Sequence, residues 1–272
     1  MNGSSTHDPV SIRRAWFFNG FRDVYVTRYL RKHFHAVRLS KSSAEVPSDD
    51  APIIVVLNHP SWWDPMICML LTTRFGNREH FAAIDELAKQ KYKFFPKLGF
   101  FGVDTKSLRG AAAFLRTARH LLNAPNRALW ITAQGRFSDV RQRPLNLQSG
   151  VGHLAARMTR GWILPVALEY AFWTERTPEA LIRVGEPIDI SELPRRQGRE
   201  WIQRIETALT ATLDDLNEEA ITRDPELFKV ILSGKTGVGG MYDFWRRLAA
   251  WTNFRKFRPA HSDGLLLPGT RS

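Results

Sequence analysis

The chain has 272 residues, of which 43% are hydrophobic and 24% are charged, a composition that excludes wholesale disorder and suffices for one substantial α/β core. The formal net charge of +12 indicates an anionic partner, which can be a nucleic acid, a membrane surface or a phosphorylated substrate. Cys68 is the only cysteine, which excludes an intrachain disulfide, and no apolar run reaches the roughly 20 residues that span a bilayer.

The N-terminal part of the chain divides into two predicted segments. Residues 1–12 are predicted to be a disordered N-terminus, and residues 13–40 an amphipathic helical segment that associates with a membrane. In this second segment, aromatic and basic residues alternate at helical spacing, which is typical of helices at a membrane interface. The alternative is a helix that packs on its own domain. The aromatic residues are Trp16, Phe17, Phe18, Phe21, Tyr25 and Tyr29.

The predicted core follows a linker over residues 41–51, which is rich in Ser, Asp and Pro. The all-apolar run Ile53–Leu57 predicts a buried strand. Alternating strands and helices then predict an α/β fold with one mixed sheet and helices on both faces. This domain is placed at residues 52–222. The further predicted strands are 81–84, 128–133, 163–170 and 181–184, and the predicted helices are 65–73, 107–122, 150–159 and 199–219.

A basic C-terminal extension is predicted at residues 223–272. Between Met241 and Arg258, aromatic and basic residues alternate again, which favours an anionic lipid surface. Single-stranded nucleic acid is the alternative, but no nucleic-acid-binding signature accompanies the pattern, so no nucleic acid is expected as a partner. The sequence also lacks a signal-peptide pattern. We therefore expect a cytoplasmic chain that is peripherally associated with the membrane.

The Gly-Lys-Thr sequence at residues 234–236 is a candidate phosphate-binding loop. That motif requires a glycine five positions earlier, where this chain has Lys229. The segment is therefore predicted to be an ordinary loop.

His59 and Asp64 form the candidate catalytic pair, in the loop that follows the first buried strand. Sites tend to form at the carboxyl ends of strands in open α/β sheets. A histidine can act as a general base near neutral pH, and a carboxylate can orient its ring and stabilise the imidazolium. The alternative is structural, because Asp64 before Pro65 also matches the N-cap of a helix.

The segment from Asn58 to Asp64, Asn-His-Pro-Ser-Trp-Trp-Asp, resembles the N-H-x-x-x-x-D block of the PlsC-type glycerolipid acyltransferases, which include lysophosphatidic acid acyltransferases. Four further blocks resemble that family in the same order, so that the resemblance covers about residues 52–190. They are 99–104, which resembles its glycine-bearing second block, 131–138 for F-P-E-G-T-R-S, 144–150 for P-F-K-x-G and 163–167 for I-V-P-V.

The resemblance implies a 1-acylglycerol-3-phosphate O-acyltransferase-like enzyme, with His59 as general base and Asp64 as the residue that orients it. Acyl-CoA or acyl carrier protein would donate the acyl group to a hydroxyl of a lysophospholipid or related lipid. Neither a cofactor nor a metal is implied, because a thioester reacts without metal activation. The substrate-binding residues that the resemblance implies are Asn58, Lys106, Gln134, Gly135 and Arg136.

The chain departs from the family pattern at several positions. Gln134 stands where the family has a glutamate, and glutamine can form hydrogen bonds but carries no charge. Phe137 replaces an arginine, and Lys106 is the nearest cation to the arginine missing from the second block. These changes put a lysophosphatidate acceptor in doubt. They also motivate a second hypothesis, a catalytically silent lipid-binding protein.

The loop after Gly135 offers a candidate anion site. Arg136, Arg141 and Arg143 follow one another closely there, and arginine binds phosphate with two parallel hydrogen bonds. The alternative is a solvated basic loop.

Overall fold

The computed structural model describes residues 8–104, 107–192 and 197–234. Nine strands in these ranges form one mixed sheet in the order β4-β3-β5-β2-β6-β7-β1-β9, with β8 paired to β6. The strands are β1 (Ala36–Ser40), β2 (Ile53–Leu57), β3 (Glu79–Asp85), β4 (Phe100–Val103), β5 (Arg127–Thr132), β6 (Trp162–Ala171), β7 (Glu179–Val184), β8 (Ile188–Asp189) and β9 (Phe228–Ser233).

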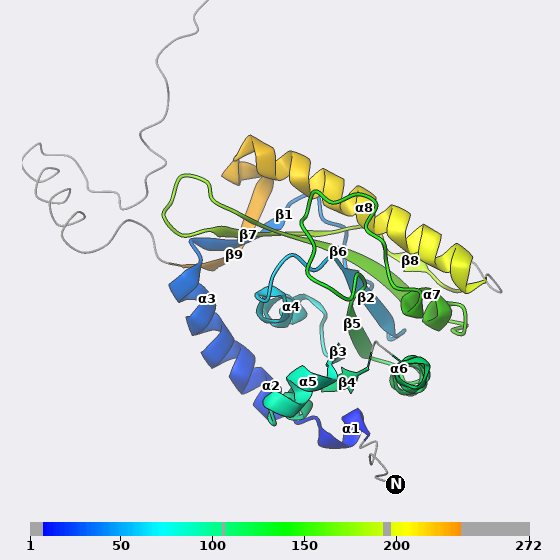
Figure 1. The fold of residues 1–272 in the computed structure, drawn as a ribbon. Coiled ribbons are helices and arrows are strands. Elements are labelled where there is room, and N and C mark those ends of the chain that lie inside the picture. Colours follow the sequence, from blue (N-terminus) through cyan, green and yellow to red (C-terminus); the bar gives the residue numbers. More distant parts are fainter. Residues whose placement is uncertain (1–7, 105–106, 193–196, 235–272) are drawn as a thin grey trace, which may run out of the picture.

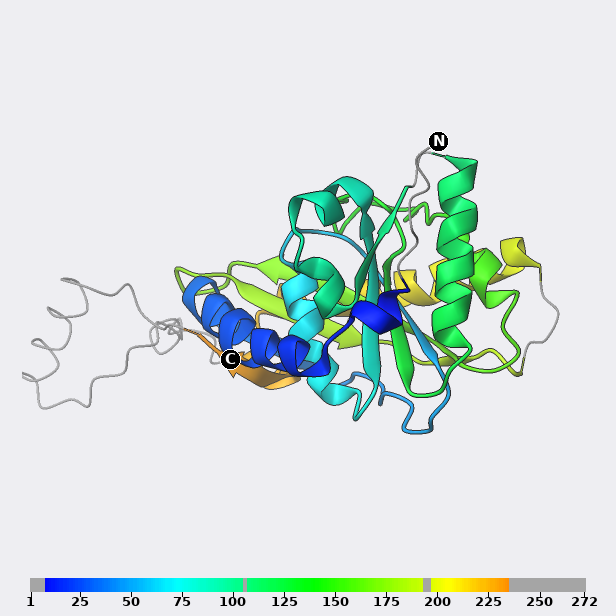
Figure 2. The same ribbon diagram turned by 90° about the horizontal axis from the view of Figure 1, so that it is seen from below.

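The helices cover both faces of the sheet, as Figures 1 and 2 show. The α-helices are α1 (Pro9–Ile12), α2 (Ala15–Gly20), α3 (Thr27–His33), α4 (Asp64–Leu71), α5 (Glu86–Lys91), α6 (Leu108–Leu122), α7 (Gly150–Ala155) and α8 (Gly198–Thr222). A π-helical turn, Phe21–Val26, joins α2 to α3. Short 3-10 turns occupy Thr72–Arg74, Phe95–Leu98 and Pro225–Leu227. The α/β class, the single mixed sheet and the helices on both faces are confirmed.

Strand β2 separates two apolar cores, because its side chains alternate between the faces of the sheet. Ile54 and Val56 belong to the core beneath α6, α7 and α8. Ile53, Val55 and Leu57 belong to the core beneath α4 and the N-terminal helices. All five side chains are buried, which explains why the sequence shows an apolar run instead of an alternating one.

The strands in the middle of the sheet are parallel, so that their carboxyl ends meet at one edge. Leu57, the last residue of β2, lies beside Thr132 of β5 and Val166 of β6. The loops that follow β2 and β5 therefore leave the sheet side by side. The Asn58–Asp64 segment and the segment that begins at Ala133, far apart in the sequence, are neighbours at this edge.

The sheet extends beyond the predicted domain limits of 52–222 at both ends. Strand β1 lies between β7 and β9, and β9 belongs to the predicted C-terminal extension. Residues 9–12, predicted to be disordered, form the short helix α1, in which the Asp8 side chain accepts a hydrogen bond from the Val10 amide. The predicted basic aromatic stretch from Met241 to Arg258 lies outside the described residues.

The N-terminal helices of the predicted segment 13–40 pack on their own domain along one side, and association with a membrane stays a prediction. Phe18, Val26 and Leu30 are buried against the domain, so one side of the segment packs on the core. Trp16 and Val24 are exposed on the other side, at 75% and 58% of their surface. Within the described ranges, no helix combines the length and the apolar character needed to cross a bilayer.

Candidate active site

His59 and Asp64 meet directly at the carboxyl edge of the sheet. Nδ1 of His59 lies 2.6 Å from Oδ2 of Asp64. The carboxylate is buried, with 1% of its side chain exposed, whereas 19% of the histidine side chain is exposed. A carboxylate accepts hydrogen bonds, so this contact places the proton of a neutral His59 on Nδ1 and leaves the Nε2 lone pair free to accept another proton.

Tyr170 is the third member of this arrangement, and its hydroxyl donates a hydrogen bond of 2.7 Å to Oδ1 of Asp64. The Ser61 amide donates to Oδ2 over 3.3 Å. Both carboxylate oxygens are thereby held, and the His59 ring is held by the carboxylate. Burial raises the pKa of Tyr170 well above its ordinary value, with Asp64 adding to the effect, so the phenol stays protonated and can only donate to this anion.

The structure does not support Asp64 as the N-cap of a helix that begins at Pro65. Helix α4 begins at Asp64 itself, and Trp63 occupies the cap position. The Asp64 carboxylate is turned toward His59 and Tyr170, away from the free amides of its own helix. The backbone of Asp64, next to Pro65, forms the first residue of the helix, whereas its side chain contacts His59 and Tyr170.

Asn58 and Gln134 brace the loops around His59 from inside the protein. The Asn58 side chain is buried, donates to the carbonyl of Leu168 over 2.9 Å and accepts from the amide of Leu168 over 2.8 Å. Gln134 is also buried; it accepts from the His59 amide over 3.1 Å and donates to the carbonyl of Leu145 over 3.2 Å. These contacts give both residues a structural role, and the predicted substrate contact stays a prediction.

A largely apolar cavity of about 660 Å³ opens beside the pair and is lined by both His59 and Asp64. Its walls come from α4, the strands β3, β4 and β5, and helix α6. Apolar side chains that line it include Leu57, Phe81, Leu98, Phe100, Leu115 and Trp130. Cys68 also lines it, and burial, with Asp64 adding to the effect, raises the pKa of its thiol well above the ordinary value. The thiol is therefore protonated at neutral pH and a poor nucleophile.

Arg136 and Phe137 flank the cavity on the side of the His59 ring. The ring centroids of His59 and Phe137 are 4.3 Å apart, and 59% of Phe137 is exposed. Arg136 and Gly135 line the cavity, and both are exposed. Gly135 has a φ of +65°, which a side chain would strain, so the turn here favours glycine. The Phe137 ring thus lies beside His59, where the family pattern has an arginine.

Two arginines of the candidate anion site are engaged in ion pairs. Arg141 pairs with Asp139 over 2.7 Å, and Arg143 pairs with Asp214. Arg136 is the arginine of this loop that lines the cavity, and within the described part of the chain no ion pair engages it. Lys106, the other predicted substrate-binding cation, lies outside the described residues.

The family model described as Acyltransferase matches residues 33–169, just over half of the chain. The chain belongs to the acyltransferase family. The matched domain is that of PlsC-type glycerolipid acyltransferases, as the sequence blocks predict. A search of curated proteins finds no match to this chain.

The matched region of this acyltransferase contains His59 and Asp64, together with the bracing residues Asn58 and Gln134. Tyr170 lies one residue past its end. Tyr170 is not among the site residues predicted from the sequence. A signal was present, because Tyr170 ends a strand that is predicted to lie in the same sheet as Ile53–Leu57, but the sequence alone does not show that these strands are adjacent.

Proposed function

We propose that this acyltransferase moves a fatty acyl group from acyl-CoA or acyl carrier protein to a hydroxyl of a lysophospholipid or related lipid, with His59 as general base. The observation that carries the proposal is the Asp64-oriented His59, whose Nε2 is unengaged among the described residues, at an apolar cavity of about 660 Å³. A cavity of this size and lining suits an acyl chain.

The chemistry needs one proton acceptor at the site. Nε2 of His59 accepts the proton of the acceptor hydroxyl as its oxygen attacks the carbonyl carbon of the thioester. The C–S bond then breaks, and the imidazolium returns the proton to the departing thiolate. Asp64 stabilises the charged ring between these two steps. No covalent enzyme intermediate is required, and Cys68 is unsuited to form one.

The acceptor is proposed to enter beside Arg136 and Phe137. Arg136 supplies a positive charge for a phosphate, although one arginine binds it less firmly than the two cations of the family pattern. Phe137 supplies an apolar contact beside His59. This combination favours an acceptor with an apolar group next to its hydroxyl over lysophosphatidate itself.

Turnover measurements test the proposal directly. The purified protein is incubated with acyl-CoA or acyl carrier protein donors and a panel of lysolipids, and products are identified by mass spectrometry. An acylated lipid that forms with the wild type and not with the Asp64→Asn variant supports the proposal. Absence of any product, together with binding of the lipids, favours the second candidate, a catalytically silent lipid-binding protein, which the Phe137 ring against His59 also favours.

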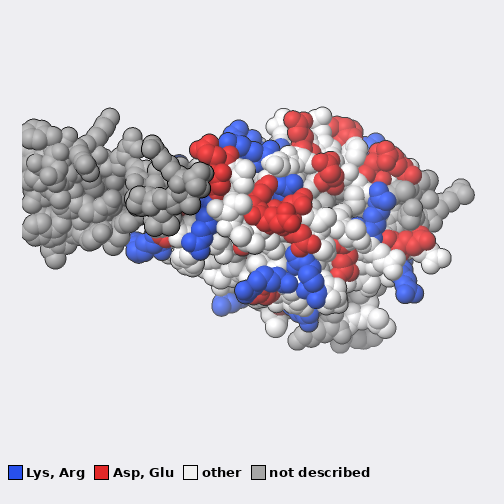
Figure 3. Space-filling model, turned by 90° about the horizontal axis from the view of Figure 1, so that it is seen from above, with Lys and Arg blue, Asp and Glu red and all other residues white. Residues whose placement is uncertain are grey.

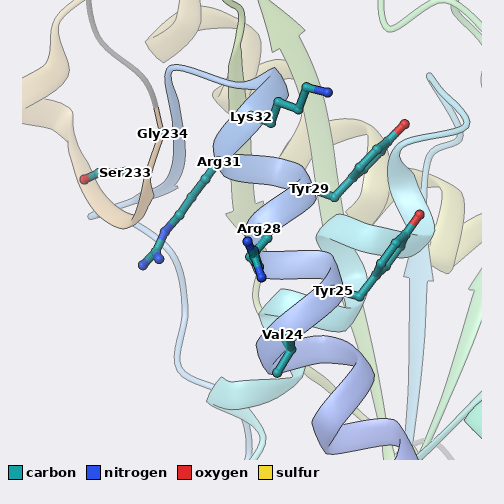
Figure 4. A pocket seen from close by; sticks show the side chains of 8 residues that line it. All are labelled: Val24, Tyr25, Arg28, Tyr29, Arg31, Lys32, Ser233 and Gly234. Carbon is teal, nitrogen blue, oxygen red and sulfur yellow. The ribbon is translucent and has the colours of Figure 1, made fainter.

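A membrane-facing surface is proposed on the N-terminal helices. A shallow groove is lined there by Val24, Tyr25, Arg28, Tyr29, Arg31, Lys32, Ser233 and Gly234. Figure 4 shows Arg31 directed toward the β9 end of this groove, with Tyr25 and Tyr29 on the other side of the helix. Three exposed cations and the exposed ring of Tyr25 suit the headgroup region of an anionic bilayer.

This surface adjoins the catalytic loop through a row of stacked aromatic rings. Successive centroids along Phe21, Tyr25 and Tyr29 are 4.8 and 5.7 Å apart. Tyr29 lies 5.5 Å from Trp63, which stacks on Trp62 at 4.5 Å. Because Trp62 lines the cavity and is 52% exposed, a bilayer that contacts the N-terminal helices lies beside the substrate entrance.

The α8 face offers no comparable surface. Figure 3 shows acidic and basic side chains interspersed over it, with acidic groups gathered near its centre. Asp214, Asp215 and Glu218 of α8 are exposed. An anionic bilayer is therefore expected to avoid α8.

Vesicle sedimentation tests the membrane proposal. The Arg28→Gln/Arg31→Gln/Lys32→Gln variant is expected to bind phosphatidylglycerol-containing vesicles at least about tenfold more weakly than the wild type, since each cation near the surface contributes about 1 kcal/mol. The matched control is Arg109→Gln/Arg116→Gln/Arg119→Gln, which removes three exposed charges from α6. Equal weakening in both variants would indicate a general effect of net charge and refute the assigned surface.

A further inference from the structure

The apolar cavity contains a buried histidine that the proposed chemistry does not use. His80 of β3 lines this cavity and is 5% exposed. Its ring stacks on Phe18 at 6.0 Å and meets Phe75 edge-on at 5.5 Å. A histidine ring surrounded by aromatic side chains is unusual, because a buried polar group is unfavourable unless it forms hydrogen bonds.

One hydrogen bond fixes which ring nitrogen of His80 carries the proton. The indole N–H of Trp130 lies 3.1 Å from Nδ1. Tryptophan only donates, so Nδ1 accepts and the proton of the neutral ring is on Nε2. Burial, together with the nearby guanidinium groups of Arg13, Arg22 and Arg78, lowers the pKa of His80 to about 3. The ring is therefore neutral at physiological pH, with a single N–H donor at Nε2.

That donor retains accessible surface at the cavity wall. No described residue accepts a hydrogen bond from Nε2, and this atom is not among the fully enclosed polar atoms that lack a partner. Some accessible surface therefore remains at Nε2. Because His80 lines the cavity and is otherwise buried, this surface belongs to the cavity wall.

The neighbouring polar group in this part of the cavity is already engaged. The hydroxyl of Thr72, which also lines the cavity, donates to the carbonyl of Met69 over 2.7 Å and accepts from Arg22 over 3.3 Å. Nε2–H of His80 is thus a fixed donor among apolar and satisfied groups. Such a donor selects for an oxygen that accepts a hydrogen bond, since an alkyl chain leaves it unpaired.

The donor lies far from the reacting centre. His80 is beside Ala128 in the sheet, and Ala128 is beside Ile53. Leu57, at the end of β2, lies four residues and roughly 13 Å beyond Ile53 along the strand direction, and His59 follows it in the loop. An oxygen that reaches His80 is therefore carried on the acyl chain itself, at a distance from the thioester carbonyl.

We propose that the acyl site of this enzyme recognises a donor whose chain bears an oxygen substituent, a hydroxyl or a keto group, through a hydrogen bond from Nε2 of His80. This inference rests on the proposed acyl-transfer function. It adds the substrate class, an oxygenated acyl chain, and assigns His80 as the residue that determines this specificity.

Binding of unreactive ligands tests the inference apart from turnover. S-alkyl pantetheines of one long chain length are compared by calorimetry, either unsubstituted or bearing a hydroxyl or keto group at successive positions toward the chain end. Pantetheine is the arm that CoA and acyl carrier protein share. We expect the wild type to bind one oxygenated isomer about tenfold or more tightly than the unsubstituted ligand. The hydroxyl and keto series show which oxygen is preferred.

Two variants assign the preference to His80. His80→Phe removes the donor and is expected to abolish the preference, while His80→Gln keeps an N–H donor and is expected to retain part of it. Equal binding of all ligands by the wild type overturns the inference, as does an unchanged preference in a folded His80→Phe protein. Failure of every ligand to bind overturns it too, because the cavity is then not an acyl site. An oxygen preference in binding without transfer to any acceptor would instead contradict the proposed function alone.

Discussion

Replacement of Tyr170 by phenylalanine isolates one hydrogen bond at the centre of the site. The change removes only the hydroxyl that donates to Oδ1 of Asp64 over 2.7 Å, and keeps the ring that packs 5.7 Å from Phe34. The Asp64 carboxylate then retains its bonds from His59 and from the Ser61 amide. No cavity larger than a hydroxyl is created, so packing losses are small.

The expected magnitude follows from the charge and burial of Asp64. A hydrogen bond to a charged group contributes about 1.5–3 kcal/mol, part of which is offset because the buried phenol no longer has to be desolvated. We expect the free energy of unfolding to fall by about 1–2 kcal/mol, which lowers Tm by roughly 2–8 °C for a domain of this size. With Asp64 less firmly held, His59 is less well oriented, and kcat is expected to fall about tenfold, equivalent to about 1.4 kcal/mol.

Thermal melting and steady-state kinetics with one donor and one lysolipid measure both effects. KM is expected to stay within about twofold, because Tyr170 is proposed to touch neither substrate. Tyr92→Phe, at a partly exposed position outside the site, is the control. An unchanged kcat in a Tyr170→Phe protein of lowered Tm would show that the hydroxyl stabilises the fold and has no part in positioning His59.

Two further perturbations test other parts of the structure. Gln134→Met keeps the size of the side chain but leaves the His59 amide and the Leu145 carbonyl without their partner. We therefore expect the free energy of unfolding to fall by about 1–3 kcal/mol, together with a lower kcat. Wild-type values of both quantities in denaturant melts and kinetics would refute the bracing role. The second perturbation concerns His80, because burial lowers its pKa from 6.5 to about 3. Between these pH values the unfolded chain binds a proton at His80 that the folded protein does not. The contribution of His80 to the free energy of unfolding is therefore fully present above about pH 6.5 and is lost as the pH decreases. Between pH 7 and pH 5, denaturant melts should show roughly 2 kcal/mol more destabilisation in the wild type than in His80→Phe, and equal losses in the two proteins would contradict this assignment.

The sequence predicts the middle of the fold well because local patterns determine it. The Ile53–Leu57 strand is confirmed at its predicted bounds, since an all-apolar β-branched run has few alternatives to a buried strand. The amphipathic helix predicted at residues 199–219 is confirmed within α8. Strands β1 and β9 are not predicted, because the local pattern of neither segment is that of a buried strand. Ala36–Ser40 follows directly on a helical pattern, and Phe228–Ser233 has exposed Lys229 and Val230 on an edge strand.

The site is predictable where its residues are close in sequence. His59 and Asp64 are five positions apart, and one tight loop brings them together as expected. Tyr170 lies 106 positions from Asp64, and its contact arises only when β2 and β6 pair. The sequence equally conceals the inward orientation of Asn58 and Gln134, because polar residues next to a histidine are as compatible with substrate contact as with loop bracing.

The proposed chemistry requires Nε2 of His59 to accept the proton of the acceptor hydroxyl. The His59→Asn variant tests it most directly, because the Asn amide can replace Nδ1 as donor to Asp64 while nothing replaces Nε2. The measurement is the single-turnover rate of acyl transfer to a lysolipid, with folding checked by melting. We expect this rate to fall on the order of 10²- to 10⁴-fold relative to the wild type. Transfer at the wild-type rate by a folded His59→Asn protein would contradict it.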